Sequence, residues 1–429
     1  MGEIQALRGT RDILPDEVGY WQWVEATARD ILSRAAYREI RTPIFEQTAL
    51  FERGIGEATD VVGKEMYTFN DKATPPRSVT LRPEGTAGVV RAFIERNLYA
   101  TGGVQRLWYT GAMFRYENPQ AGRQRQFHQL GVEVIGSPDP RADVEVIAIA
   151  TNILQTLGLK NLHLDINSVG NSEDRQNYRQ ALIDYLTPYK DELDVDSQDR
   201  LNRNPLRILD SKNKRTQEIA QNAPSILDYL GSYSQRHFEQ VQLLLSELGI
   251  KYNINPRLVR GLDYYTHTAF EIQSDDLGAQ ATVCGGGRYD GLVGELGGSD
   301  TPAVGWAIGL ERLIILLQQI QAPPISTIDF YVVSKGDLAE AQALILAHKL
   351  RLAGFSVELD LSGSGFKKQF VRADRSGAVA CLIIGDEEAA NQTVKLKWMK
   401  TKEQNAIAQT ELLTMFDQLR QQINTFRAS

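Results

Sequence analysis

The chain has 429 residues, of which 42% are hydrophobic and 24% charged, and its formal net charge is −7. This length allows two or three domains with a large core, and the composition is ordinary for a soluble globular protein. The acidic net charge gives no support to nucleic-acid binding, but it leaves room for a local basic patch.

Cysteine usage and the N-terminus indicate the compartment. The two cysteines, Cys284 and Cys381, lie far apart without a Cys/His cluster, so we expect neither a metal site nor a disulfide framework. The first residues, MGEIQALRGTRD, contain no apolar run, and no stretch approaches the roughly 20 apolar residues of a membrane span. We therefore expect a cytoplasmic protein without a membrane contact.

The first 78 residues alternate between periodic and irregular stretches. Apolar residues at helical spacing predict an amphipathic helix over residues 21–36. Residues 37–46 are strand-like, but Pro43 prevents pairing on both sides along the whole length, which favours an edge or interface strand. Residues 47–78 are predicted to be a flexible excursion that ends in a short strand.

Residues 79–86 predict a strand that runs into a helix over residues 87–97. Thr86 is the candidate N-cap of this helix. Glu84 then lies just before the helix N-terminus, where the helix dipole stabilises a carboxylate. Capping alone can account for Glu84, and a contact with a cationic ligand is the alternative.

Residues 108–136 predict two long strands joined by a polar loop. Side chains alternate with period 2, so Gln129, Gly131 and Glu133 share one face of the return strand. A glycine between two polar side chains leaves a notch where a ligand can approach the backbone.

Basic residues gather at the turn of this hairpin. Arg115 ends the outgoing strand, and the loop adds Arg123 and Arg125. Such a loop beside a carboxamide and a carboxylate suits a substrate with phosphate at one end and an amine at the other. The alternative is a solvated hairpin with an ordinary polar face.

The middle of the chain changes character. A helix is predicted over residues 142–157 and a strand over residues 163–170, whereas residues 171–250 are polar and helical. We interpret that stretch as a helical insertion in the main domain, and its charges are most simply a solvated face.

Residues 258–272 form the second dense group of polar and aromatic residues. Arg260, Tyr264 and Tyr265 lie before or at the start of a predicted strand, where loops carry function. Strand alternation places His267 and Glu271 on one face, together with Tyr265. A lone histidine such as His267 is more often a buried core residue than a catalyst. The opposite face then carries Thr266, Thr268, Phe270 and Ile272.

Residues 283–298 are glycine-rich but are not a P-loop, because no Gly-Lys-Ser/Thr follows. We expect close-packed backbone beside a ligand pocket. Residues 302–317 predict an apolar strand and then a helix with Arg312 in its first turn. An arginine there opposes the helix dipole, so an anionic partner is expected.

Residues 321–324, Gln-Ala-Pro-Pro, are the best domain boundary and separate residues 1–322 from residues 326–429. Beyond it, strands alternate with helices, which predicts an α/β layer with a mostly parallel sheet. Lys367, Lys368 and Arg372 cluster near a helix start, and a solvated face is the usual explanation.

Three motifs carry a family resemblance. The hairpin sequences FRYE and GRQRQFHQLGVEVIG resemble the second signature of class II aminoacyl-tRNA synthetases, and Gly-Leu-Glu-Arg at residues 309–312 resembles the third. Arg-Gly-Leu-Asp-Tyr-Tyr at residues 260–265 resembles a motif peculiar to histidyl-tRNA synthetases. The resemblance implies an α+β fold with a six- or seven-stranded antiparallel class II sheet flanked by helices. It also implies a helical insertion at about residues 171–250 and a C-terminal α/β anticodon-binding domain.

The resemblance implies activation of L-histidine with ATP and transfer to the 3' end of tRNA(His). It further implies Mg²⁺ bound through the ATP phosphates, and a homodimer that uses residues 37–46. Two rivals are a histidine-binding regulatory subunit of ATP phosphoribosyltransferase and a noncatalytic tRNA-binding relative. The intact motif at residues 260–265 and the C-terminal domain disfavour the first, and the arginines at 115, 260 and 312 disfavour the second.

The resemblance also implies site residues. The catalytic residues would be Arg115, Arg260 and Arg312. The histidine-binding residues would be Glu84, Gly85, Thr86, Gln129, Glu133, Tyr264 and Tyr265. The ATP-binding residues would be Arg115, Glu117, Arg123, Gln129, Arg260 and Arg312. The sequence departs from the family pattern at Asn118 and Gln124, where an arginine and an aromatic are expected, which affects loop contacts to ATP or tRNA and not the fold.

Overall fold

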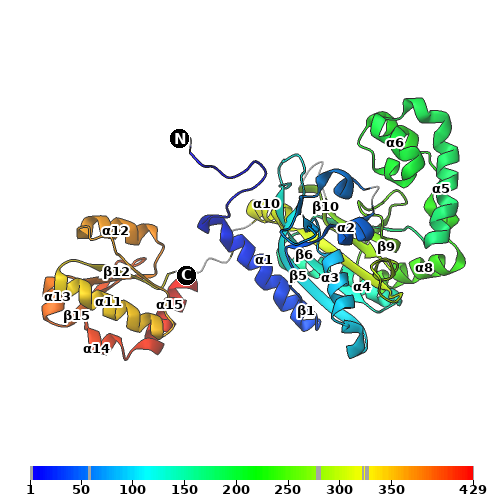
Figure 1. Ribbon diagram of the computed structural model, residues 1–429. Coiled ribbons are helices and arrows are strands. Elements are labelled where there is room, and N and C mark those ends of the chain that lie inside the picture. The colour runs from blue at the N-terminus through cyan, green and yellow to red at the C-terminus, as the bar shows by residue number, and fades with distance from the viewer. Residues whose placement is uncertain (1–2, 57–58, 277–281, 321–322, 324–327, 429) are drawn as a thin grey trace. The chain divides into compact units, whose positions relative to one another are not determined.

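The computed structural model describes residues 3–56, 59–276, 282–320, 323 and 328–428. The chain divides into two compact units, Met1–Pro323 and Pro324–Ser429 (Figure 1). Within the described ranges, none of the helices combines the length and the apolar content that a membrane crossing requires. Sheets flanked by helices in both units confirm the expected α+β class.

An eight-stranded sheet forms the centre of the first unit. Its order is β1 (Arg38–Glu39), β5 (Gln105–Phe114), β6 (Gln126–Ile135), β11 (Ala303–Gly309), β10 (Thr282–Arg288), β9 (Thr266–Ser274), β7 (Leu162–Ser168) and β8 (Asn253–Ile254). The strands from β5 to β7 in this order pair antiparallel, whereas β1 and β8 join the two edges in parallel. The expectation of six or seven antiparallel strands is therefore wrong at the edges. Both edge strands have 2 residues, too few to show a strand period in the sequence.

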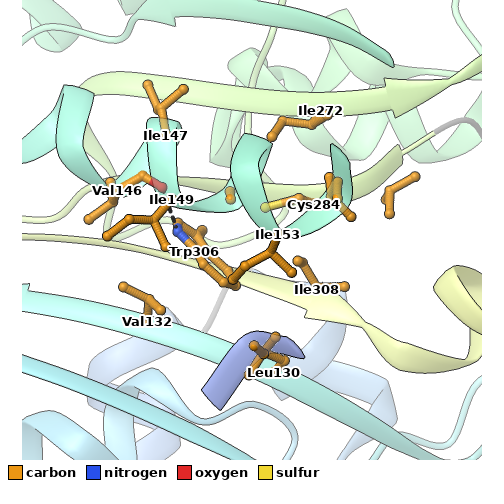
Figure 2. Close-up of a cluster of buried hydrophobic side chains, with 14 of the residues drawn as sticks. Leu130, Val132, Val146, Ile147, Ile149, Ile153, Ile272, Cys284, Trp306 and Ile308 are labelled. Carbon is orange, nitrogen blue, oxygen red and sulfur yellow. Dashed lines mark hydrogen bonds between the residues drawn. The ribbon is translucent and has the colours of Figure 1, made fainter. Parts of the chain in front are cut away.

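The main hydrophobic core lies on one face of this sheet, beneath four helices. They are α1 (Pro15–Arg34), α4 (Pro140–Thr156), α8 (Ser232–Glu247) and α10 (Leu310–Ile320). Figure 2 shows Val146 and Ile153 of α4 next to Trp306 of the sheet, and Leu130 of β6 belongs to the same cluster. The Trp306 indole Nε1 donates a hydrogen bond to the carbonyl of Val146 at 2.8 Å, so this buried N–H group has a partner.

The opposite face of the sheet carries smaller helices and, as described below, the polar cavity. These helices are α3 (Thr86–Glu95), a 3-10 turn (Leu98–Thr101) and α9 (Leu292–Glu295). Val89 and Phe93 of α3 pack against Leu107 and Tyr109 of β5 and anchor α3 to this face.

Pro43 divides the strand expected over residues 37–46. The first part is β1, and the second part is β2 (Phe45–Gln47), which belongs to a separate three-stranded sheet with β4 (Ser78–Leu81) and β3 (Thr68–Asn70). β4 is the central strand and pairs antiparallel with both neighbours.

The described residues within 47–78 form regular elements, so the expectation of a flexible excursion is wrong, whereas a short strand, β3, is present near its end as expected. They contain α2 (Thr48–Ile55) and a π-helical turn (Val61–Glu65). Leu50, Phe51 and Ile55 bury one face of α2. Their helical spacing is present in the sequence, but the stretch is short and carries little other signal.

The insertion after β7 is helical. It contains α5 (Ser172–Leu186), α6 (Val195–Arg203), α7 (Lys214–Ala220) and 3-10 turns at Thr187–Glu192, Pro205–Asp210 and Ile226–Tyr229. Tyr178, Leu182 and Leu201 belong to a small core of its own, and α5 and α6 project from one end of the main sheet (Figure 1). α8 lies within residues 171–250 as well, but its Phe238 and Val241 pack into the main core.

The second unit has a five-stranded sheet in the order β13 (Val357–Leu359), β12 (Phe330–Ser334), β14 (Ala380–Ile384), β15 (Thr393–Trp398) and β16 (Gln404–Ala408). Its helices are α11 (Asp337–Leu352), α12 (Phe366–Arg375), α13 (Asp386–Ala390), α14 (Gln409–Leu412) and α15 (Phe416–Ala428). β12 pairs in parallel with β13 and β14, but the pairs of β15 are antiparallel. The sheet is therefore mixed rather than mostly parallel, because β15 and β16 form a hairpin.

Candidate active site

A cavity of about 660 Å³ lies on the face of the main sheet opposite the hydrophobic core. Most of the predicted site residues line it: Glu84, Thr86, Arg115, Glu117, Arg123, Gln129, Arg260, Tyr264, Tyr265 and Arg312. The remaining two are not part of this lining: Gly85 packs against Tyr109, and Glu133 accepts a hydrogen bond from Thr86. Elements far apart in the sequence thus meet in one polar space.

The side chain of Glu84 caps the N-terminus of α3. Its buried carboxylate accepts hydrogen bonds from the backbone N–H groups of Thr86 at 2.6 Å and Ala87 at 2.9 Å. The N-cap of α3 is Gly85, so the prediction of Thr86 as N-cap is wrong. The side chain of Glu84 supplies the acceptor that an N-cap residue would otherwise provide. Burial raises the pKa of Glu84, and these backbone donors act against that effect.

Glu133 is buried beside Glu84 and surrounded by hydroxyl groups. Its carboxylate accepts hydrogen bonds from Thr86 Oγ1 at 2.7 Å, from the Tyr109 hydroxyl at 3.4 Å and from the Tyr289 hydroxyl. Burial raises the pKa of Glu133 to about 8, although these hydroxyls favour the charged form. The two carboxyl groups make this end of the cavity suited to a ligand with N–H donors or positive charge.

The notch predicted at Gly131 exists, but a side chain of the protein fills it. A Cβ atom at Gly131 would lie 2.2 Å from Cζ of Tyr109, its cross-strand partner on β5. The same ring also leaves no room for a Cβ atom at Gly85, which would lie 2.2 Å from Cε2 of Tyr109. The two glycines therefore accommodate the ring that supports Glu133, and the prediction of a direct ligand approach at Gly131 is wrong.

Arg260 occupies the other part of the cavity. Its guanidinium pairs with the carboxylate of Glu271 on β9, and that carboxylate also accepts a hydrogen bond from Thr282 Oγ1 at 2.8 Å. The side chain lies over Gly285 of β10, where a Cβ atom would be 2.2 Å from Nη2 of Arg260. Glycine is thus required at position 285 for the arginine to lie against the sheet.

Three more guanidinium groups face the same space. Arg115 Nε donates to the carbonyl of Pro83 at 2.8 Å, which ties the hairpin to the strand before Glu84. Arg123 of the hairpin loop lies 3.4 Å from Glu117. Arg312 lies in the first turn of α10, as predicted, and its Nη1 donates to the carbonyl of Thr282 at 2.9 Å. This part of the cavity is suited to an anion with several oxygens.

Tyrosine rings and an amide cover the region between these two ends. The ring centroids of Tyr264 and Tyr265 are 4.7 Å apart, and those of Tyr264 and Tyr289 are 5.6 Å apart. Gln129 Oε1 is buried and has no hydrogen-bond partner among the described residues. A buried acceptor without a partner carries a free-energy cost that a donor on a ligand would remove.

A β-bulge in β9 separates two residues that were predicted to share one face, His267 and Glu271, so that prediction is wrong. Gly287 pairs with Ala269, whereas Arg288 pairs with Thr266, so His267 and Thr268 together oppose one step of β10. His267 has a φ of 48°. An inserted residue shifts the alternation. Glu271 therefore faces the cavity. His267 is buried on the core side, where its ring stacks on that of His237 of α8 with the ring centroids 5.4 Å apart.

Sequence reasoning missed Tyr109, Tyr289 and the role of Glu271. A signal for Tyr109 exists, since a bulky residue directly opposite a glycine on a paired strand can fill its notch. Tyr289 and Glu271 have no comparable local signal, because they reach Glu133 and Arg260 only through the folded sheet.

In the second unit, the predicted basic cluster is partly neutralised. Arg372 of α12 donates to the carboxylate of Asp360 at 2.7 Å and also contacts Ser362 and Ser364. Lys367 and Lys368 are exposed on the first turn of the same helix.

Comparisons with known proteins extend over both units. The family profile for histidyl-tRNA synthetase matches residues 9–313, and that for the anticodon binding domain matches residues 329–419. A histidine–tRNA ligase of Gloeothece citriformis is 75% identical over 429 residues, which covers 100% of this chain and 99% of that protein. A histidine–tRNA ligase of Crocosphaera subtropica is 72% identical over 424 residues, which covers 99% of this chain and 98% of that protein.

A solved structure is similar as well. The S. aureus histidyl-tRNA synthetase has 40% sequence identity and a TM-score of 0.81, and the match covers 96% of this chain and 100% of that one. The similarity therefore includes the whole fold and is not confined to the motifs.

Proposed function

The chain belongs to the histidyl-tRNA synthetase family, and we propose that the cavity of the first unit is where it activates L-histidine with ATP. The overall reaction is that of a histidine–tRNA ligase. The carrying observation is that one cavity combines the buried carboxylate of Glu84, with Glu133 bonded next to it through Thr86, and the guanidinium groups of Arg115, Arg260 and Arg312.

The first step joins histidine to the adenylyl group of ATP. An oxygen of the histidine carboxylate attacks the α-phosphorus, the bond to the β-phosphate oxygen breaks, and pyrophosphate leaves. Arg115 and Arg260 bracket the α-phosphate and Arg312 holds distal phosphate, while Glu117 and Arg123 contribute to the ATP side. Positioning and charge stabilisation dominate such a step, because the protein forms no covalent bond. ATP enters as its magnesium complex, so the ion arrives with the substrate.

Histidine itself binds at the carboxylate end. Glu84, Gln129 and Glu133 accept hydrogen bonds from the amino group and the imidazole, and Thr86 and Gly85 shape the turn that presents Glu84. Tyr264 and Tyr265 close the pocket. The unpartnered Oε1 of Gln129 supports this assignment, because it supplies an acceptor aimed at a ligand.

The second step transfers the histidyl group to tRNA(His). The terminal ribose hydroxyl attacks the carbonyl carbon of the adenylate, and AMP leaves with the bonding electron pair. The second unit, which matches the anticodon binding domain, contacts the anticodon. We place this activity in the cytoplasm, the expected compartment for tRNA charging.

We also propose that two chains form a homodimer through the three-stranded sheet. Phe45 and Phe69 of this sheet and Ile44 just before β2 are large apolar residues, and they are 58%, 49% and 49% exposed. Cross-strand pairing through β4 puts Phe45 and Phe69 on the same face of that sheet. Apolar side chains grouped in this way are typical of protein interfaces.

The regulatory-subunit alternative receives less support. The chain keeps the Arg-Gly-Leu-Asp-Tyr-Tyr motif at residues 260–265, and the second unit matches the anticodon binding domain. The ligases of Gloeothece and Crocosphaera match almost the full length at more than 70% identity.

The test is histidine-dependent exchange of pyrophosphate into ATP by the purified chain. We expect exchange with L-histidine and with no other standard amino acid. A site built on hydrogen bonds rejects analogues that lack the matching groups by roughly 10⁴-fold or more. If the rate of exchange with L-histidine does not exceed the rate without any amino acid, the proposed function is overturned.

A further inference from the structure

The insertion holds the backbone on both sides of Tyr264. Arg175 of α5 donates from Nη1 to the carbonyl of Tyr265 at 2.8 Å and to the carbonyl of Asp263 at 3.3 Å. Arg175 is half-buried and is not among the residues that line the main cavity. Its guanidinium therefore acts on the tyrosine segment from behind.

Two further insertion side chains hold the same segment. Asn204, which ends α6, donates from Nδ2 to the carboxylate of Asp263 at 2.9 Å. Arg207 donates from Nη1 to the carbonyl of Arg260 at 3.4 Å. Both belong to the insertion, so the segment at residues 260–265 is bonded to the insertion at more than one point.

Packing behind the segment is incomplete. A second cavity of about 260 Å³ lies between the insertion and the segment. Its lining comprises Val169, Arg175, Asn204, Leu206, Arg207, Val259, Arg260, Leu262, Asp263 and Tyr265. This space is partly open to solvent, so fewer side chains pack against the back of the segment. Directional hydrogen bonds are therefore more important for the position of this segment than they would be in a close-packed core.

We propose that Arg175 is a positioning residue for histidine binding, which links the insertion to the active site. By holding the carbonyls on both sides of Tyr264, it keeps Tyr264 and Tyr265 in place against the histidine pocket. A guanidinium suits this task because it offers several N–H donors in one rigid plane. The inference rests on the proposed function of the main cavity.

The test compares two variants of Arg175 with a control on the same helix. In pyrophosphate exchange, R175A should raise the KM for histidine by roughly 10- to 100-fold, the scale for a supporting residue that orients binding groups. The KM for ATP should stay at the wild-type value, because the arginines on the ATP side keep their own contacts. R175K should recover part of the loss, since an ammonium group can still donate to these carbonyls.

The control is R179A, one turn further along α5. Arg179 donates to the carbonyl of Asn202 within the insertion, so its loss should leave the KM for histidine unchanged. An unchanged KM for histidine in R175A would overturn the proposal. It would also be overturned if the KM for both substrates rose together with a lower thermal unfolding temperature, which is the pattern of a purely structural role. Absence of histidine-dependent exchange in the wild-type chain would instead overturn the proposed function.

Discussion

At Arg260, the geometry of a side chain can be tested separately from its charge. The guanidinium pairs with Glu271 and lies flat over Gly285, where it faces the space assigned to the α-phosphate. R260K keeps the charge but loses the planar fork that grips two oxygens at once. We expect adenylate formation in a single turnover to slow by roughly 10²-fold or more, the scale for one preorganised donor.

Histidine affinity should change little in R260K, because the contacts proposed for histidine lie at the carboxylate end. That combination marks an interaction made mainly in the transition state. R257K is the matched control, since Arg257 is exposed and donates to the carbonyl of Gln221 in the insertion. If adenylate formation stays near the wild-type rate while histidine binding collapses, Arg260 is a substrate-binding residue and the assignment fails.

Because the pKa of Glu133 is raised, we expect histidine binding to depend on pH. Burial raises its pKa to about 8, so the free protein holds a proton there at neutral pH. N–H donors of bound histidine favour the ionised carboxylate, and binding therefore releases this proton. Affinity should then rise with pH up to about 8, by at most about tenfold per pH unit, and level off above it.

Titration calorimetry in two buffers with different ionisation enthalpies measures this proton release. The range from about pH 7 to pH 8 is suitable, because it lies above the ordinary pKa of the ligand's imidazole. E133Q should bind histidine more weakly and without this release. Equal proton release by E133Q and the wild-type chain would show that another group titrates.

Among the elements, the three-stranded sheet of β2, β4 and β3 carries the dimer prediction. Phe45 and Phe69 are exposed on one face of that sheet. Replacing both with serine should weaken association by at least about 2 kcal/mol, or roughly 30-fold in Kd, if they are central to the interface. Sedimentation should show a dimer for the wild-type chain at micromolar concentration and more monomer for the double variant.

L248S serves as the control for that experiment, because Leu248 is 59% exposed at the end of α8 and away from this sheet. It should sediment as the wild-type chain does. A monomeric wild-type chain at micromolar concentration would contradict the homodimer.

For the whole molecule, the two compact units predict separable tasks. The hydrophobic core of each unit is built from its own residues. A chain that ends near Ala322 should keep histidine-dependent pyrophosphate exchange but should charge tRNA poorly, because it lacks the match to the anticodon binding domain. Circular dichroism of the shortened chain tests its folding. Loss of exchange together with global unfolding would show that the first unit depends on the second.

The sequence by itself determined the family, the α+β class and a group of ten residues that line the same cavity. The motifs at residues 108–136, 260–265 and 309–312 carry the family signal. The alternation of Gln129, Gly131 and Glu133 placed one face of β6 correctly. These features are local, since side-chain direction in a regular strand follows from the backbone period alone.

Only the tertiary structure decided which residues these segments contact in the folded chain. Tyr109 fills the notch at Gly131, and the bulge at His267 turns that ring toward the core while Glu271 faces the cavity. The link from Arg175 to the backbone beside Tyr264 joins residues about 90 positions apart. A sequence period reports the conformation of one segment. It cannot report which partner lies across a sheet, where an inserted residue shifts the register, or which distant carbonyl a side chain reaches, because these depend on contacts that form only when the chain is folded.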